Sequence, residues 1–382
     1  MNEYLLSGLI GAVVGYVANA VMDAIKMKLN NTMMGFKVKK IKDSLSSVSF
    51  KAKDGYMALD HAVPQYKEKN IKLKNTNKTF VYPIPNTYRE TLENMGFKYN
   101  DSSDYRQSEM ISTFNALGIK DCNEALTVAA NEVAQSFIDD LKQGYIRFNG
   151  YLFGVSNIHL NRVGEEEDAV LSMELYKTDY FTYRVFANLY KKYRDRFNLN
   201  SIADFNKIPH FLSSFGLGCF IIASDGVQDY MIIAHRGSNV IVDKDRYHFS
   251  MNEAFSMLDV DMFGNPSLVS CLYRGLKEEL GINEAYNSKI SEFGFLDLSA
   301  DIDRLECGIS CYVKMTFDAE FTIEQFSKQY STAKDKELET KNLHFVPMKE
   351  LQSFISSNAG KLSAGCKHGL ESLLARYEAG QI

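Results

Sequence analysis

The sequence predicts a mixed protein of the α+β type, with strands and helices in separate stretches of the chain. Three observations lead to this prediction. Crisp strand and helix patterns fill residues 210–382, a weaker mixture of helices and strands precedes them, and an uncharged run occupies residues 4–22. Because the apolar residues recur with strand or helix period in separate parts, we expect a C-terminal domain, a connector region and one N-terminal transmembrane helix.

The 382-residue chain has the composition of an ordinary globular protein, with 45% hydrophobic and 24% charged residues. A chain of this length holds about two to three domains. Its formal net charge of −5 offers no general attraction for nucleic acid, so neither DNA nor RNA is an expected partner. The six cysteines are scattered without a CxxC pair, which indicates reduced thiols in a cytosolic domain.

The uncharged segment at residues 4–22 reads YLLSGLIGAVVGYVANAVM and lies between Glu3 and Asp23. As a helix it would extend roughly 28 Å, close to the ~30 Å hydrocarbon core of a bilayer. Only Glu3 and the amino terminus precede it, whereas several lysines follow it between positions 26 and 42. Since lysines are retained on the cytoplasmic side, we expect a single-pass protein whose C-terminal domain is cytoplasmic.

Two alternatives to a membrane helix remain open for this segment. A cleaved signal peptide is the main one, because Ala18-Asn19-Ala20 has the small-x-small pattern of a cleavage site, although no basic residue precedes the apolar run. The other is a buried helix of a soluble protein.

One face of the predicted membrane helix carries small or polar residues at every fourth position, namely Ser7, Gly11, Gly15 and Asn19. Small residues allow two helix backbones to approach closely, and the Asn19 amide can hydrogen-bond across such a contact. We therefore predict that the helix contacts membrane lipid and that copies of the chain self-associate through this stripe.

The middle of the chain divides into two predicted connectors. Residues 23–120 are expected to form a juxtamembrane, irregular connector. Within it, residues 43–120 are polar and weakly patterned, and residues 74–90 predict a short strand followed by a loop broken by Pro83 and Pro85. Residues 121–209 show clearer periodicity and are expected to form a mixed helix and strand connector. Within it we predict a helix at 123–143, strands at 151–160 and 168–176, and a helix from about 179 to 197.

The pattern becomes sharper in residues 210–382. A hairpin is predicted from the strands GLGCFIIAS and DYMIIAHR, which flank a turn at Asp225-Gly226. The segment PSLVSCLYRGLKEELGI predicts a helix that ends at Gly281, because glycine suits a left-handed C-terminal cap. Further strands are predicted at EFGFLDLSA, ECGISCYVKMTF and LHFVP, and two more helices follow them.

The helix segment RGLKEELGI resembles the box of Nudix hydrolases, written loosely as G-x5-E-x7-R-E-U-x-E-E-x-G-U, where U is a bulky aliphatic residue. The residues that match it as they stand are Arg274, Leu276, Glu278, Glu279, Gly281 and Ile282. Three positions depart from it, because Gly275, Pro266 and Val260 stand where the box has two glutamates and its first glycine. The resemblance covers about residues 210–382 and implies a Nudix-like mixed sheet sandwiched by helices, in an α-β-α arrangement.

Adjacent glutamates on one helix can hold Mg²⁺, a hard cation that prefers oxygen ligands. By resemblance, Glu278 and Glu279 would bind a possible Mg²⁺ ion, and Arg274 would orient Glu278 through an i,i+4 pair. Gly275 cannot act as a base or a ligand, so hydrolase competence is in doubt. Replacement acids could come from the preceding loop or from downstream strands; the candidates are Glu253, Asp259, Asp261, Glu306 and Glu320. Glu253, Arg236 and His235 are also the predicted ligand contacts.

A membrane helix joined to a Nudix-like domain with a degraded box resembles the transmembrane-Nudix effectors of bacterial CBASS anti-phage systems. The resemblance implies a protein of the bacterial inner membrane that binds a cyclic oligonucleotide, or another nucleotide, and assembles to disrupt the membrane. One alternative is a membrane-tethered, Mg²⁺-dependent nucleoside-diphosphate-X pyrophosphohydrolase. Another is a membrane-associated scaffold whose Nudix-like fold mediates only protein contacts.

Overall fold

The structure is a computed structural model that describes residues 55–98, 107–145, 148–165, 167–237, 243–334 and 340–382, together with Lys39. The predicted membrane helix at residues 4–22, with its stripe of Ser7, Gly11, Gly15 and Asn19, lies outside these residues. Within the described ranges, no helix combines the length and the apolar content needed to cross a bilayer.

A mixed sheet forms the centre of the C-terminal part, with strand order β1-β9-β10-β5-β6-β11. The short strands β7 and β8 pair with β6 and β5. Strands β10 and β5 run parallel, and the other neighbouring pairs are antiparallel. The strand bounds are β1 Tyr56–Tyr66, β5 Phe215–Ser224, β6 Asp229–Arg236, β7 Tyr247–His248, β8 Met251–Ala254, β9 Ile290–Asp301, β10 Glu306–Thr316 and β11 Thr340–Pro347.

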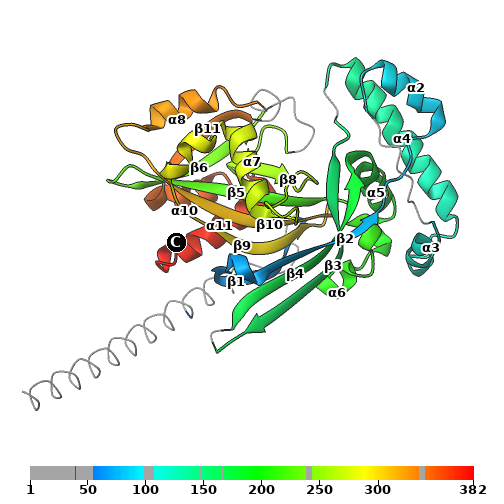
Figure 1. The fold of residues 1–382 in the computed structure, drawn as a ribbon, viewed down its shortest axis with the longest axis horizontal. Coiled ribbons are helices and arrows are strands. Elements are labelled where there is room, and N and C mark those ends of the chain that lie inside the picture. The colour runs from blue at the N-terminus through cyan, green and yellow to red at the C-terminus, as the bar shows by residue number, and fades with distance from the viewer. Residues whose placement is uncertain are drawn as a thin grey trace, which may run out of the picture.

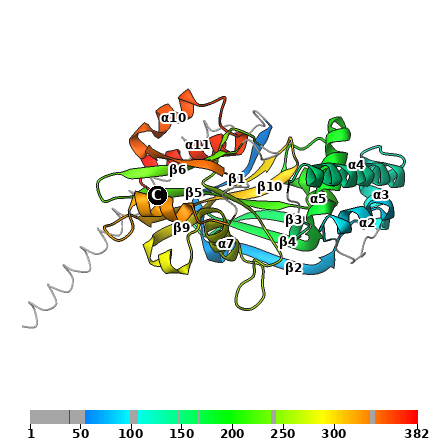
Figure 2. The ribbon, with the colours of Figure 1, turned by 90° about the horizontal axis from the view of Figure 1, so that it is seen from above.

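Helices cover both faces of this sheet, as Figure 2 shows, with α7 on one side and α10 and α11 on the other. Strand β5 explains the two layers, because successive side chains of a strand point to opposite faces. Leu217, Cys219 and Ile221 join the core cluster that contains α7, whereas Phe220 and Ile222 join the cluster of α10 and α11. The helix bounds are α7 Leu268–Leu280, α8 Ile323–Tyr330, α10 Leu351–Ser357 and α11 Ala364–Glu378. The α-β-α arrangement predicted from the sequence is thus observed.

A smaller sheet with strand order β2-β4-β3 lies beside the larger one, together with the helices α4 and α5 (Figure 1). Backbone hydrogen bonds join the two parts, because Phe153 N–H donates to Phe255 O at 2.9 Å and Val155 N–H donates to Leu212 O at 2.8 Å. The bounds are β2 Ile71–Thr79, β3 Tyr151–Val163, β4 Asp168–Asp179, α2 Asn86–Asn94, α3 Gln107–Ala116, α4 Cys122–Lys142, α5 Tyr180–Lys192 and α6 Ile202–Phe205.

The region 121–209 contains the predicted helices and strands, with one difference at the second helix. Helix α5 ends at Lys192, and a short 3₁₀ turn at Arg194–Arg196 follows where one continuous helix to residue 197 was expected. The described part of region 23–120 holds β2, which overlaps the short strand predicted within residues 74–90, and also β1, α2 and α3, which were not predicted.

Strand β1 belongs to the larger sheet and pairs with β9 at its edge. Its sequence YMALDHAVPQY places the polar residues Asp60 and His61 at buried positions and includes Pro64. A strand normally shows alternating apolar residues and rarely contains proline, so this segment lacks the usual strand pattern. Asp60 is tolerated because it pairs with Arg162, and the Nδ1 atom of His61 pairs with Asp297 on β9.

Candidate functional site

Helix α7 carries the box residues, and local interactions fix both of its ends. At its start the Ser267 hydroxyl accepts a hydrogen bond from Ser270 N–H at 3.2 Å, as expected for an N-cap serine. At its end Gly281 adopts the left-handed conformation with φ of 70°, which glycine reaches without steric cost. The predicted C-terminal cap is therefore confirmed, and the helix presents Arg274 and Glu278 on one side.

Arg274 is the centre of the site. Its Nε and Nη2 atoms donate to the two carboxylate oxygens of Asp259 at 2.7 and 2.9 Å. Its Nη1 atom lies 2.9 Å from Glu253 Oε1 and 3.2 Å from Glu278 Oε2, and Nη2 also donates to Ala254 O at 2.8 Å. The predicted i,i+4 pair with Glu278 is present. All five N–H donors of the guanidinium group therefore have an acceptor.

Ion pairs keep Arg274 and Glu278 in their charged forms. Burial opposes the charge on Arg274, but the hydrogen bond to Asp259 and the charge of Glu253 outweigh it and raise the pKa of Arg274. Burial likewise opposes ionisation of Glu278, but hydrogen bonds from Lys334 and Arg274 outweigh it and lower the pKa of that carboxyl. Lys334 Nζ lies 3.0 Å from Glu278 Oε1. The carboxylate of Glu278 is thus held between two cations.

Glu279 points in a different direction from Glu278. Its side chain is buried, and its two oxygens accept a hydrogen bond from Asn252 N–H on β8 at 3.1 and 3.2 Å. Glu279 therefore ties the box helix to β8, while Glu278 faces Arg274 and Lys334.

Gly275 packs directly against β8. A Cβ atom built on Gly275 would overlap the Sδ atom of Met251 and would lie 3.0 Å from the Met251 Cε atom. The side chain of Met251 is buried, so it fills the space next to the helix at this position. The box glutamate is therefore absent, and the space beside its backbone position is occupied by a methionine.

The structure separates the candidate replacement acids into two groups. Glu253 and Asp259 contact Arg274 and lie at the box. The others lie elsewhere: Asp261 accepts hydrogen bonds within its own exposed turn, Glu306 pairs with Arg304, and Glu320 pairs with Lys289.

A cavity of about 290 Å³ lies beside the box, over the start of strands β5 and β10 and next to β8. Glu253 lines it on one side and contacts Arg274 on the other, so the cavity adjoins the box cluster. A second depression of about 580 Å³ lies along α7 and is lined by residues that include Arg274, Lys277, Glu278 and Lys334. The first cavity has a mixed lining whose polar and aromatic members include Tyr56, Arg236, His248, Phe249, Glu253, Ser299, Asp301, Arg304 and Glu306.

Arg304 organises the charges at the far side of the first cavity. Its guanidinium group lies 2.6 Å from Asp301, 3.1 Å from Asp243 and 3.5 Å from Glu306. Burial lowers the pKa of His248 to about 4, although the hydrogen bond with Asp243 opposes this shift. His248 is therefore neutral at pH 7 and can donate or accept a hydrogen bond in the cavity wall.

Two of the three predicted ligand contacts line the cavity, namely Glu253 and Arg236. His235 lies outside its lining, where the imidazole contacts the rings of Tyr247 and His344. Sequence reasoning missed Tyr56 and Arg304, because neither belongs to a motif and both reach the cavity only through the pairing of β1, β9 and β10.

The carboxylates of the box do not converge on a single point. Glu253 and Glu278 both contact Arg274, whereas Glu279 is buried against β8. Within the part of the chain that the structure describes, the one group of three or more histidine, cysteine or acidic residues with ligand atoms within 4.8 Å of one another lies elsewhere. The arrangement therefore does not fit a Mg²⁺ site, and Mg²⁺ would have to displace Arg274 from its carboxylates.

No protein-family model matches the chain, and no curated protein matches it. Several solved structures are similar over a part of it. A mutT/nudix family protein from Listeria innocua has 10% identity and a TM-score of 0.30, covering 44% of this chain and 95% of that protein. The NUDIX domain of Shewanella oneidensis NrtR, complexed with ADP ribose, has 10% identity and a TM-score of 0.27, covering 44% and 88%.

A third similar structure is the Ap4A hydrolase of C. elegans in a binary complex. It has 12% identity and a TM-score of 0.26, and the similarity covers 44% of this chain and 98% of that one. Because these TM-scores are below 0.5, the Nudix-like interpretation rests on the box residues of α7 and on the mixed sheet between helices.

Proposed function

We propose that the C-terminal domain binds a cyclic oligonucleotide second messenger, or a related nucleotide, in the cavity beside the box and keeps it intact. In the full chain, this binding would drive assembly of the predicted membrane helix and disrupt the bacterial inner membrane during anti-phage defence. The observation that carries the proposal is the state of the box, where Gly275 replaces a glutamate and Met251 fills the adjoining space.

The loss of hydrolysis has a simple physical basis. Hydrolysis at phosphorus needs a group that activates water, commonly a general base or a metal ion. Gly275 has no side chain that can accept a proton. The carboxylates that remain are engaged, because Glu253 and Glu278 pair with Arg274 and Glu279 accepts from Asn252 N–H. A bound phosphoanhydride or phosphodiester would therefore meet no activated water at the box.

The cavity offers chemistry that suits a nucleotide. Tyr56 and Phe249 supply aromatic surface for a base, and Arg236 supplies a cation for phosphate. Lys277 and Lys334 line the second depression beside the box, where a ligand that extends past Glu253 would meet further positive charge. The lining also carries Glu253, Asp301 and Glu306, so the phosphate of a nucleotide would bind at Arg236 while its base lies against the aromatic rings.

Strand β1 provides a route from the cavity to the N-terminal segment. Tyr56 lines the cavity, and it is the first residue of β1, which directly follows the segment that leads from the predicted membrane helix. A ligand can shift assembly only if it binds the assembled state more tightly than the resting state. A ligand contact on Tyr56 is one way in which occupancy could be sensed by the N-terminal segment.

The test distinguishes a nucleotide that stays bound intact from one that is cleaved. The purified full-length chain is incubated with cyclic dinucleotides, cyclic trinucleotides, ADP-ribose and nucleoside triphosphates, with and without Mg²⁺, and mass spectrometry identifies what is bound and what is cleaved. We expect one cyclic oligonucleotide to be retained intact in both conditions. Mg²⁺-dependent cleavage that Glu279→Gln abolishes would establish the pyrophosphohydrolase alternative, and binding of no nucleotide would favour the scaffold alternative.

A further inference from the structure

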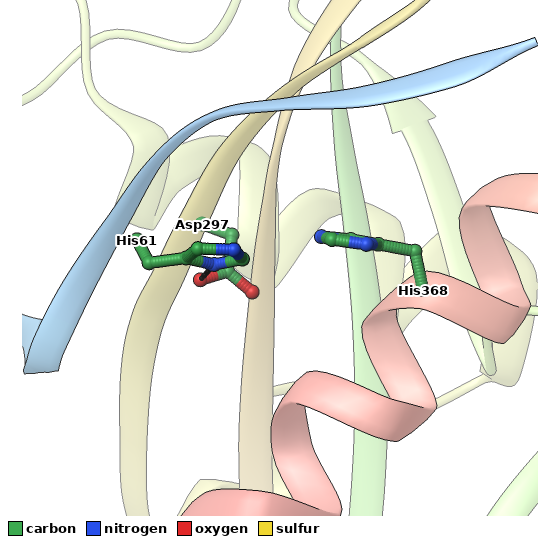
Figure 3. A group of neighbouring side chains, drawn as sticks. All are labelled: His61, Asp297 and His368. Atoms are coloured by element: carbon green, nitrogen blue, oxygen red, sulfur yellow. Dashed lines mark hydrogen bonds and ion pairs between the residues drawn. The ribbon is translucent and has the colours of Figure 1, made fainter. Parts of the chain in front are cut away.

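A cluster of potential metal ligands lies away from the box, between β1, β9 and α11 (Figure 3). It consists of His61, Asp297 and His368, whose ligand atoms all lie within 4.8 Å of one another. Of the residues that the structure describes, these form the one such group of histidine, cysteine or acidic side chains. The three residues are far apart in the sequence, so only the fold brings them together.

Asp297 holds His61 in a defined orientation. The Nδ1 atom of His61 lies 2.7 Å from Asp297 Oδ1, which also accepts a hydrogen bond from Arg376 Nη2 at 2.8 Å. The Ser372 hydroxyl donates to the other oxygen of Asp297. With Nδ1 directed at a carboxylate, the remaining nitrogen of His61 points toward His368 in Figure 3. A carboxylate bound to one imidazole nitrogen is the usual outer partner of a metal-binding histidine.

His368 approaches the pair from α11. Its ring centroid lies 5.5 Å from that of His61, and the two ring planes differ by 21°. Its Nε2 atom is buried and has no hydrogen-bond partner among the described residues. Burial lowers the pKa of His368 to about 4, although the charge of Asp297 opposes this shift. The imidazole is therefore neutral at pH 7, which is the form that binds metals.

We propose that a late first-row divalent metal ion, of which Zn²⁺ is the representative, binds between His61 and His368, with Asp297 fixing His61 as its outer partner. Arg376 is fully buried and offsets the charge of Asp297, so neutral imidazole nitrogens provide most of the binding. Such ligands favour Zn²⁺, Ni²⁺ or Cu²⁺ over Mg²⁺ and Ca²⁺, which prefer several oxygen ligands.

The geometry requires only a small adjustment. Zinc–nitrogen bonds are about 2.0–2.1 Å long, so two nitrogens in a tetrahedral site lie roughly 3.3 Å apart. One ligand atom of each of the three residues lies within 4.8 Å of the others, so a rotation of the His368 side chain toward His61 would be needed to bring two nitrogens to this separation. Water molecules would complete the coordination, and with two protein nitrogens the affinity should be moderate.

Binding at this position would join β1 to α11. His61 lies on the edge strand β1, and His368 also contacts the ring of Tyr56 at a centroid distance of 5.4 Å. Since Tyr56 lines the nucleotide cavity, a bound ion would fix the strand that connects this cavity to the N-terminal segment. The metal site itself does not depend on nucleotide binding.

The test uses the full-length chain after chelator treatment, with Zn²⁺ as the probe and a chromophoric chelator as the competitor. We expect one equivalent of Zn²⁺ to bind with a Kd in the micromolar range, and we expect His368→Gln to weaken binding at least about tenfold. His159→Gln is the matched control, because His159 lies exposed on β3 and should contribute nothing.

Three outcomes would overturn the proposal. The first is that the wild-type chain binds no Zn²⁺ at concentrations on the order of 100 μM. The second is that His368→Gln binds Zn²⁺ as tightly as the wild-type chain. The third is that Glu253→Gln, and not His368→Gln, loses binding, which would place the ion at the box. If His368→Gln fails to fold, X-ray absorption of the wild-type chain loaded with Zn²⁺ decides the matter. Imidazole scattering from two histidines supports the site, and its absence contradicts it.

Discussion

At the residue scale, Arg274 is the group on which the box cluster depends. Its removal would leave Asp259, which is buried, and Glu253 without their cation. Breaking a buried pair by removing one partner is strongly destabilising, so we expect Arg274→Ala to lower the free energy of unfolding by about 3 kcal/mol. Arg274→Lys should recover only part of the loss, because lysine cannot bind the two oxygens of Asp259 in the same way. Chemical denaturation measures both changes.

Lys334→Ala is the control for this prediction. Lys334 also pairs with Glu278, but its side chain is 70% exposed, and exposed pairs contribute at most about 1 kcal/mol. A cost for Lys334→Ala equal to that for Arg274→Ala would contradict the central position of the arginine.

Gly275 gives a second prediction at this scale. Gly275→Ala should destabilise the domain by about 1–2 kcal/mol despite the better helix propensity of alanine, because the new methyl group would overlap Met251. The cost should disappear when Met251→Ala is combined with it, and denaturation of the two single variants and the double variant measures this coupling. Gly360→Ala is the control, since nothing lies within 4 Å of a Cβ at that position. Independent, additive effects of Gly275→Ala and Met251→Ala would show that the two residues do not share this space.

The lowered pKa of His248 predicts that the stability of the protein depends on pH. This pKa is about 4 in the folded protein and 6.5 in a model peptide, so the unfolded chain binds the proton more readily. Stability is therefore highest above pH 6.5 and falls as the pH is lowered toward 4, by on the order of 2 kcal/mol at pH 5. The groups that face His248 are Asp243, which favours its protonation, and Arg236 and Arg304, which oppose it.

Thermal melts between pH 7 and pH 5 test this expectation. The fall in melting temperature should be smaller in His248→Gln than in the wild-type chain. An equal fall in both would mean that other groups take up the protons.

At the element scale, β1 is held by a buried network around Arg376. The guanidinium group donates to Ala62 O and Pro64 O on β1, both at 2.7 Å, and pairs with Asp297 on β9 at 2.8 Å. We expect Arg376→Gln to loosen β1, because its carbonyl groups and Asp297 lose their donors. Amide hydrogen exchange should therefore increase in residues 56–66 and much less in β5. Arg194→Gln, which breaks an exposed pair with Asp303, should leave β1 unchanged.

The box helix and strand β1 show what the sequence could and could not predict. Helix α7 was predictable because its caps, its apolar face and the box all lie within a short segment. The role of β1 was not predictable, since its buried Asp60 pairs with Arg162 and the Nδ1 atom of its buried His61 pairs with Asp297, and no local pattern connects these partners. For the same reason, the predicted acids Glu278 and Glu279 could be named from the sequence, but their separate directions could not.

At the scale of the whole molecule, the proposal requires the predicted membrane helix to self-associate. Gly11→Leu or Gly15→Leu should abolish ligand-dependent leakage of dye from vesicles that contain the full-length chain, because a large side chain prevents close helix contact. Nucleotide affinity should stay unchanged, since these residues lie outside the binding domain. Val13→Leu, on the opposite face of the predicted helix, should leave leakage intact. Leakage that persists in Gly11→Leu and Gly15→Leu would contradict assembly through this stripe.

The central claim is that the chain binds a nucleotide without a metal ion and without cleaving it. The most direct measurement is a titration of the full-length chain with the retained cyclic oligonucleotide, in Mg²⁺ and in EDTA, followed by mass spectrometry of the ligand after prolonged incubation. Because Arg274 already pairs with the carboxylates of Glu253, Asp259 and Glu278, we predict the same affinity in both buffers and an intact ligand. Binding that disappears in EDTA, or a ligand converted to cleavage products in Mg²⁺, would contradict this account.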